Sequence, residues 1–209
     1  MTQLPSYPEL ALAPLPSNVR RFPIAPQNNA LQDFPAIAKV QEHWESLRAG
    51  RLAPARSEID PRPLANALDV LFVAELVAPG LARLRLCGQH LSELLGMEPR
   101  GMPLSMFFTN EGRDGLSSAL KQVGKGARAT LPLRAEKGLG RPGLDGMLML
   151  LPLADHTGAI TRVLGVLETR GQIGRAPRRF KMTAEVVTKV EQPRAKGAPS
   201  LQLIKGGRS

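Results

Sequence analysis

The strongest constraint on the fold is a pair of apolar runs, residues 143–153 (GLDGMLMLLPL) and 160–168 (ITRVLGVLE). Apolar runs of this length, bounded by turn residues, are typical of buried β-strands. The connection between them, ADHTGA, is short and consists of polar and small residues, which favours an antiparallel hairpin. Any fold for this chain must therefore contain a sheet with a largely apolar interior.

Two further strands are predicted before this pair. Residues 68–77 (LDVLFVAELV) are almost continuously apolar, which predicts burial on both faces. Residues 81–87 (LARLRLC) alternate strictly and follow the turn signal Pro79-Gly80, so the two runs are predicted to form an antiparallel hairpin. The alternation places Ala82, Leu84 and Leu86 on the core face and Arg83, Arg85 and Cys87 on the other face.

A third strand is predicted at residues 128–136 (RATLPLRAE), and Pro132 lies inside it. Proline has no backbone N–H to donate to a neighbouring strand, so it is rare in central strands. This strand is therefore predicted at an edge of the sheet.

Helices are predicted before and between the strands. Residues 35–50 (PAIAKVQEHWESLRAG) repeat apolar side chains at helical spacing and end at Gly50. A short helix follows Gly88, and a longer helix is predicted to open at Asn110, a suitable N-cap. The order of elements predicts an α+β fold: a five-stranded antiparallel sheet with helices on one face, preceded by an N-terminal helix.

The net charge of +10 is distributed unevenly along the chain. Residues 1–34 hold six prolines and equal numbers of basic and acidic residues, and we expect a disordered arm there. Residues 35–170, the predicted domain, are nearly balanced. Residues 171–209 hold nine basic and two acidic residues, and they are predicted to form a basic, mostly flexible tail with a short ordered piece near residues 180–190.

Several classes of function lack a motif in this sequence. A zinc site usually takes three or four ligands, and His43 and His156 have no ligand-like partner at a suitable spacing, so we predict no metal site. No Gly-x-Ser-x-Gly motif and no histidine pair occurs, so we do not expect an enzyme. No run of eighteen apolar residues and no apolar signal segment behind the N-terminus is present, and we expect no membrane span and a cytoplasmic location.

Four short segments carry a resemblance to a known family. They are Trp44-Glu45-Ser46-Leu47-Arg48-x-Gly50, Pro54-x-Arg56-Ser57-x-Ile59-Asp60-Pro61, Arg83-x-Arg85-Leu86-x-Gly88 and Leu94-Leu95-Gly96-x-x-x-x-Gly101. In these segments the chain resembles the PAS_5 family of bacterial PAS-like domains. The resemblance covers about residues 36–170. It implies a sheet of order 2-1-5-4-3, with the third strand at an edge, in agreement with Pro132. It also implies a role in sensing or in protein binding, without a catalytic motif.

An apolar pocket between the sheet and the helices is one candidate site. Methionine adapts to irregular apolar space, and four of the seven methionines are expected there beside Phe107 and Phe108. Such a pocket could bind a small apolar ligand, and the alternative is ordinary core packing. The candidate lining residues are Leu84, Leu86, Leu94, Met102, Phe107, Leu120, Met147 and Met149.

A partner surface is a second candidate. PAS domains often pair through a first helix and the outer face of the sheet, so the resemblance implies a homodimer and signalling proteins as partners in trans. The residues expected at this surface are Val40, Trp44, Leu47, Arg56 and Asp60. For Arg56 and Asp60 the alternative is an ion pair that holds the linker, with Asp60-Pro61 as a turn.

The predicted tail supplies a third candidate. Arg175, Arg178, Arg179 and Lys181 lie close together around Phe180. They could contact an anionic partner such as nucleic acid, anionic lipid or an acidic protein face, or they could simply be solvated. No recognition-helix or RNA-binding signature accompanies them, which argues against sequence-specific DNA binding.

Cys87 and His90 form a spacing that could hold a metal, haem or a flavin-reactive thiol. The Asn-Cys-Arg motif of photoactive flavin-binding PAS domains is absent, and the later helix at residues 111–124 has no histidine for haem. We therefore predict no haem, flavin or other cofactor. The string Gly138-x-Gly140-x-x-Gly143 has no helix behind it, so it is interpreted as a hairpin loop and not as a dinucleotide site.

These observations predict a non-catalytic PAS-like sensor or interaction module in bacterial signalling. A small apolar ligand is a candidate signal, and protein partners are the expected output. The alternative is an electrostatic binder of nucleic acid or of a membrane surface, in which the basic tail acts and the domain is its scaffold.

Overall fold

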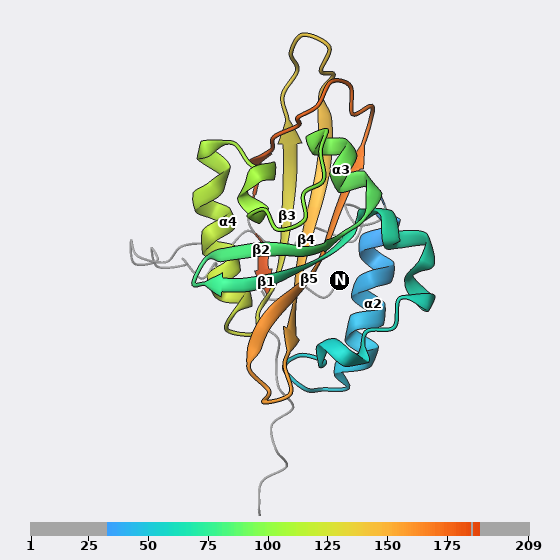
Figure 1. The fold of residues 1–209 in the computed structure, drawn as a ribbon, viewed down its shortest axis with the longest axis vertical. Helices are drawn as coiled ribbons and strands as arrows, with labels where there is room; N and C mark the ends of the chain where they lie inside the picture. The colour runs from blue at the N-terminus through green and yellow to red at the C-terminus, as the bar shows by residue number, and fades with distance from the viewer. Residues whose placement is uncertain (1–32, 185, 189–209) are drawn as a thin grey trace, which may run out of the picture.

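The computed structural model describes residues 33–184 and 186–188, and Figure 1 shows them as one antiparallel sheet with helices packed against it. The predicted arm, apart from its last two residues, and residues 189–209 of the predicted tail lie outside the described residues. The strands of this sheet and the helices packed on it set the positions of the candidate site residues.

The sheet runs in the order β2-β1-β5-β4-β3-β6, and β7 also pairs with β3. Every pairing is antiparallel. The strands are β1 (Leu71–Ala78), β2 (Leu81–Cys87), β3 (Arg128–Ala135), β4 (Leu144–Ala154), β5 (Ile160–Arg170), β6 (Lys181–Met182) and β7 (Val186–Thr188). The implied order of the first five strands is confirmed, and β6 and β7 extend the sheet beyond the predicted five.

Helices cover both faces of the sheet, whereas the prediction placed them on one face. The α4 side holds α3 (Gln89–Leu95), the 3-10 helix η3 (Leu104–Phe107) and α4 (Asn110–Val123). The α2 side holds α2 (Pro35–Arg48) and the 3-10 helix η2 (Arg62–Val70), and a short 3-10 turn η1 (Arg56–Glu58) joins them. The described residues thus form three layers, in which α2 covers the face of the sheet opposite to α4.

Strand periodicity explains why both faces are covered. Along β4, Leu148 and Leu150 pack into the cluster under α4, whereas Met149 and Leu151 pack into the cluster under α2. Successive side chains of a strand point to opposite faces, so a strand that is apolar at almost every position needs a cover on each side. Each face therefore has its own hydrophobic core.

A bulge at Arg85 changes the facing of the end of β2. The register pairs Ala74 with Leu84 but Val73 with Leu86, which leaves Arg85 as an extra residue on β2. An extra residue reverses the alternation beyond it. Leu86 is consequently 51% exposed, and Cys87 packs against the core under α4. The prediction of Leu86 on the core face and Cys87 on the outer face is therefore wrong.

The C-terminal segment covers the edge of β3. β7 pairs with Arg128 to Thr130, and β6 pairs with Leu133 and Arg134. Between them the Pro132 carbonyl accepts a hydrogen bond from the Thr183 amide at 2.9 Å. Pro132 has no N–H to donate to a neighbouring strand, so the hydrogen-bond ladder is interrupted there. The interruption lies between the residues of β3 that pair with β7 and those that pair with β6. Residues 171–184 of the predicted tail thus include a strand, β6, that extends the sheet.

Candidate functional site

The residues of the predicted apolar pocket do not meet in one place. Leu84, Leu94 and Phe107 belong to the cluster under α4, together with Leu120. Met147 and Met149 belong to the cluster under α2, on the other side of the sheet. Two groups of side chains separated by a sheet cannot line one pocket, so the predicted set is wrong as a set.

The part of that pocket under α4 is packed shut. The side chains of Leu84, Leu94 and Phe107 are 0% exposed. A side chain with no accessible surface has no water-sized space beside it, because a water molecule in such a space could touch it. Met102 is half-buried, and its carbonyl accepts a hydrogen bond from the Leu84 amide at 2.9 Å. These residues form a core and not a ligand site in this structure.

Two residues of the predicted partner surface are buried inside the chain. Val40 and Trp44 are both 0% exposed, in the cluster that α2 makes with the sheet. The Trp44 indole Nε1 donates a hydrogen bond to the Pro152 carbonyl at 2.9 Å. The guanidinium groups of Arg48 and Arg128 lie 5.9 and 6.0 Å from the centroid of the indole ring. The prediction that Val40 and Trp44 contact a partner is therefore wrong.

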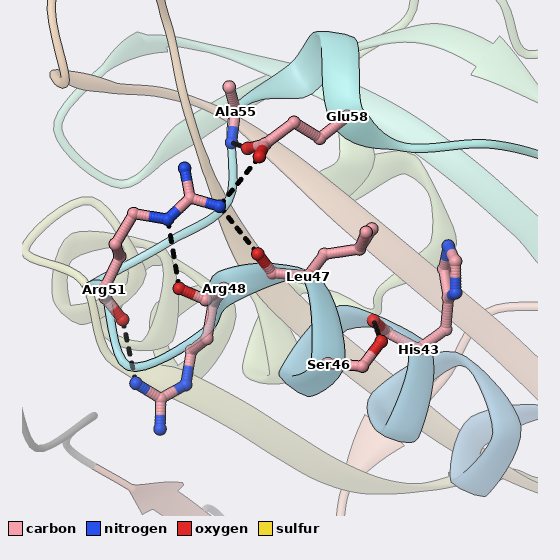
Figure 2. Close-up of polar contacts among 7 residues, drawn as sticks. All are labelled: His43, Ser46, Leu47, Arg48, Arg51, Ala55 and Glu58. Atoms are coloured by element: carbon pink, nitrogen blue, oxygen red, sulfur yellow. Dashed lines mark hydrogen bonds and ion pairs between the residues drawn. The ribbon is translucent and has the colours of Figure 1, made fainter.

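The C-terminal end of α2 is closed by arginine side chains (Figure 2). Arg51 donates to the Leu47 carbonyl at 2.6 Å and to the Arg48 carbonyl at 3.0 Å, which satisfies carbonyls that the helix leaves without partners. The Glu58 carboxylate accepts from Arg51 at 2.8 Å and from the Ala55 amide at 2.6 Å. These contacts with Arg51 and Ala55 lower the pKa of Glu58. The segment after α2 thus has a structural role.

The other three residues of the predicted partner surface are half-buried beside this cap. The Asp60 carboxylate accepts from the amide of Arg62 at 2.9 Å, and this contact lowers the pKa of Asp60. Its ion pair is with the Arg62 guanidinium, at 3.2 Å, and not with Arg56. A partner contact at Leu47, Arg56 and Asp60 stays a prediction.

The C-terminal segment docks across the helices through backbone hydrogen bonds. The Arg178 amide donates to the Leu94 carbonyl at 2.7 Å. The Phe180 amide donates to the Phe107 carbonyl at 2.8 Å, and the Phe180 carbonyl accepts from the Thr109 amide at 3.0 Å. The Phe180 ring is fully buried in the core under α4. This docking brings the basic residues of the segment against the β3–β4 loop.

Arg178 is the most buried charged residue of this segment, with 1% of its surface exposed. Its guanidinium donates to the carbonyls of Pro142, at 2.6 Å, of Glu136, at 3.4 Å, and of Ile173. Burial, and then the like charge of Arg141, lower the pKa of Arg178. All of these acceptors are neutral carbonyls, so the hydrogen bonds satisfy the donors without cancelling the charge.

The segment and the β3–β4 loop enclose a hollow of about 350 Å³, which we call the basic pocket. Its lining holds five basic residues and one acidic residue. The lining residues are Thr109, Ala135, Glu136, Lys137, Gly138, Arg141, Pro177, Arg178, Arg179 and Lys181. A hollow with this excess of positive charge attracts anions.

The charges of the basic pocket are only partly compensated. Lys181 forms ion pairs with Glu111, at 3.0 Å, and with Glu136, at 2.9 Å. Within residues 33–184 and 186–188, no carboxylate forms an ion pair with Lys137, Arg141 or Arg179. The basic pocket therefore keeps a surplus of cations.

The sequence identified this site only in part. Of the four basic residues predicted to act in a flexible tail, Arg178 and Lys181 have the buried or ion-paired roles described above, and Arg175 and Arg179 are exposed. The Arg175 carbonyl accepts from Arg141 Nε at 3.3 Å. Lys137 and Arg141 were missed, because the glycine-rich loop that holds them gave no sign of which distant segment lies beside it.

Cys87 and His90 do not form a joint site. The Cys87 thiol is half-buried, and burial raises its pKa to about 11. His90 Nε2 lies 2.9 Å from the Thr169 hydroxyl, and burial lowers the pKa of its imidazole. A thiol packed against the core and an imidazole bonded to a threonine hydroxyl are typical of structural residues.

The raised pKa predicts a slow Cys87. Only the thiolate attacks an alkylating reagent, and its population falls tenfold for each unit by which the pKa rises. At about pH 8, Cys87 in the folded protein is expected to react with iodoacetamide roughly 100-fold more slowly than in the urea-unfolded chain. Mass spectrometry of quenched time points measures both rates. Equal rates would contradict the burial of this thiol.

The described residues hold neither a metal-binding cluster nor a membrane-spanning helix. No group of three or more His, Cys, Asp or Glu side chains in residues 33–184 and 186–188 could hold a metal ion. In that same part of the chain, no helix has the length and apolar character needed to cross a membrane.

Comparisons with known proteins find one family model and several similar solved structures. The profile of the PAS_5 family, described as a PAS domain, matches residues 32–168. No curated protein matches the chain. One similar solved structure is a light-oxygen-voltage domain studied with a flavin analogue, with 16% identity, a TM-score of 0.41, and coverage of 53% of this chain and 84% of that chain.

Two other similar structures belong to the same broad group. The light-state structure of the LOV domain of the blue-light photoreceptor Aureochrome1 has 15% identity and a TM-score of 0.40, with coverage of 53% of this chain and 88% of that one. An RNA-binding light-oxygen-voltage receptor has 19% identity and a TM-score of 0.40, with coverage of 56% of this chain and 36% of the receptor.

Proposed function

The chain belongs to the PAS_5 family of PAS domains, which are sensory signalling modules, and on this premise we propose that it works without catalysis, by pairing with a second copy of itself and binding a signalling protein in trans. The family match covers more than half of the chain. No group of metal-binding side chains occurs in the described residues, and the family match favours binding over catalysis.

The observation that carries the proposal is the exposure of two leucines, Leu68 and Leu86, near the edge strand β2, and we call this place the patch. Leu86 is 51% exposed and Leu68 is 41% exposed. The backbone of Leu68 lies against Gly88, close to Leu86 in the chain. α2 packs on β4 and β5, and η2 packs on β1 and β5, so these covers lie over the other strands. Exposed leucines at such a place favour a binding surface.

A second copy of the chain fits the charges around this patch. Glu75 and Arg85 form an ion pair on the adjoining strands, and Arg83 is exposed beside them. In a two-fold symmetric contact the same patch meets itself, so a patch that carries both signs of charge can be self-complementary. We therefore propose that the homodimer contact lies at Leu86 and not at Trp44.

Leu86→Glu is expected to abolish the dimer. A carboxylate at the centre of an apolar contact loses its hydration and has no partner, which disfavours association. Sedimentation velocity of the wild-type chain and of the variant measures the change. Leu139→Glu is the matched control, because Leu139 is 91% exposed on the β3–β4 loop, away from β2. We expect a dimer for wild type and for the control, and a monomer for Leu86→Glu.

Two results would overturn this part of the proposal. A monomeric wild-type chain would show that no second copy binds. A dimer that survives Leu86→Glu with unchanged affinity would place the interface elsewhere.

Flavin and haem are not part of the proposal. The interior of the α4 side is lined by apolar side chains that leave no water-sized space beside Leu84, Leu94 or Phe107. A planar cofactor there would require these side chains to move apart, and buried hydrogen-bonding groups would be needed to orient it. We therefore propose that the α4 side holds neither group.

The alternative function, binding of nucleic acid or a membrane surface through the tail, has less support. Arg178 is buried against carbonyls and Lys181 is held by two carboxylates, which leaves Arg175 and Arg179 of the four predicted residues for such a surface. The remaining basic residues of the predicted tail lie outside the described residues.

A further inference from the structure

The charge of Arg178 is held in the basic pocket by acceptors that do not neutralise it. Its three hydrogen-bond acceptors are backbone carbonyls of Glu136, Pro142 and Ile173. Burying a cation is costly unless an opposite charge is near. Arg141 lines the same hollow and adds like charge, as its effect on Arg178 shows. An anion that enters the hollow would supply the missing opposite charge.

The donors of the basic pocket match a phosphate group. Arg141 and Arg179 present guanidinium groups, whose planar set of N–H donors fits the oxygens of a phosphate. Lys137 adds a mobile ammonium group from the loop. The Thr109 side chain caps α4, and the positive end of that helix dipole lies at the same wall. Four independent sources of positive potential therefore converge on one hollow.

The size and borders of the basic pocket favour a small ligand. Its volume of about 350 Å³ falls within the range of small-molecule sites. Glu111 and Glu136 flank the Lys181 side, and their carboxylates are 73% and 69% exposed. An extended polyanion that continued past Lys181 would meet these two negative charges. A nucleic-acid surface is usually a longer stripe of positive charge.

We propose that the basic pocket binds a small organic phosphate, held by Arg141 and Arg179 with help from Lys137. The idea that this phosphate is the signal read by the sensory module rests on the function proposed above. The prediction that the basic pocket binds a phosphate does not depend on that function. The ligand would join two parts of the chain, because Arg141 belongs to the β3–β4 loop and Arg179 belongs to the C-terminal segment. Binding would therefore strengthen the docking of that segment on β3.

Isothermal titration calorimetry on the full chain tests the proposal. The probes are inorganic pyrophosphate and AMP, and adenosine is the uncharged control. We expect saturable binding of one pyrophosphate or one AMP per chain and none of adenosine. Arg179→Gln and Lys137→Gln remove charge from exposed positions and are expected to leave the fold intact. Arg179→Gln should weaken binding roughly tenfold or more, since it removes charged hydrogen bonds to the anion.

Arg162→Gln is the matched control variant. It removes the same charge from another exposed arginine, and Arg162 pairs with Leu153 at the far end of β4, whereas the basic pocket lies near the start of that strand. Binding by this variant is expected to equal that of wild type. Circular dichroism of each variant confirms that it is folded.

Each other outcome would overturn the proposal. Absence of saturable binding of both phosphates would show that the hollow is not an anion site. Equal weakening by Arg162→Gln and Arg179→Gln would show attraction by net charge alone. Binding of single-stranded RNA or of phosphatidylserine vesicles, with no binding of the small probes, would assign the surface to a polyanion.

This experiment is separable from the dimer test. β2 and β6 lie at opposite ends of the sheet order, so Leu86→Glu is expected to keep the affinity of wild type for pyrophosphate. A chain that binds pyrophosphate but stays monomeric would refute the dimer and support the ligand site. A chain that dimerises but does not bind pyrophosphate would support the dimer and refute the ligand site.

Discussion

Trp44→Ala is expected to lower the free energy of unfolding by about 3–5 kcal/mol, the range typical of removing a buried aromatic side chain. Trp44 is fully buried between α2 and the sheet, and α2 is the main cover of that face. The substitution opens a cavity there and leaves the Pro152 carbonyl without its indole donor. Arg48 and Arg128 would also lose the ring over which they lie.

Urea denaturation followed by circular dichroism measures this effect. Fluorescence is unsuitable, because Trp44 is the single tryptophan of the chain and the variant lacks it. Trp44→Phe is the matched control. It keeps most of the apolar volume and loses the hydrogen bond, so a smaller loss of about 1–3 kcal/mol is expected. A loss below about 1 kcal/mol for Trp44→Ala would contradict the burial of α2 on the sheet.

Arg178→Gln is expected to release the C-terminal segment from β3. Three carbonyls lose their charged donor, and each hydrogen bond to a charged group contributes roughly 1.5–3 kcal/mol. The neighbouring Arg179→Gln is the matched control, since Arg179 is exposed and its substitution should change stability by less than about 0.5 kcal/mol. Two adjacent arginines are thus expected to differ greatly in effect.

Cleavage by chymotrypsin after Phe180 reports this release. Phe180 is fully buried in the docked segment, so cleavage requires local opening. Cleavage of Arg178→Gln should be at least tenfold faster than that of wild type, whereas Arg179→Gln should match wild type. Hydrogen exchange at the Phe180 and Thr183 amides, which donate to Phe107 and Pro132, gives an independent reading. Equal protection in both variants would show that Arg178 does not hold the segment.

Much of the fold could be predicted from local patterns. The runs that became β1, β4 and β5 are apolar and bounded by turn residues, and α2 has apolar residues at helical spacing. The cover of the outer face was also signalled, because β4 is apolar at nearly every position and such a strand is buried on both sides. Val40 and Trp44 belong to that cover, and for this reason the prediction that they contact a partner was wrong.

The errors at Leu86 and Cys87 have a different cause. A bulge depends on how β2 pairs with β1, and a strictly alternating sequence gives no sign of one extra residue. The filled interior under α4 was equally hidden, since methionine and phenylalanine are suited both to a ligand pocket and to a packed core. Only the packing of the helices distinguished these two cases.

The sequence by itself determined the first five strands, the helices α2, α3 and α4, the family and the excess of positive charge near residue 178, because these depend on residue type and on spacing along the chain. The tertiary structure decided where that charge is placed. Arg178 reaches the Glu136 carbonyl across 42 residues of sequence, and this contact assembles the basic pocket from two segments that share no local pattern. Such a contact depends on which surfaces pack together, so it emerges only when the chain is folded.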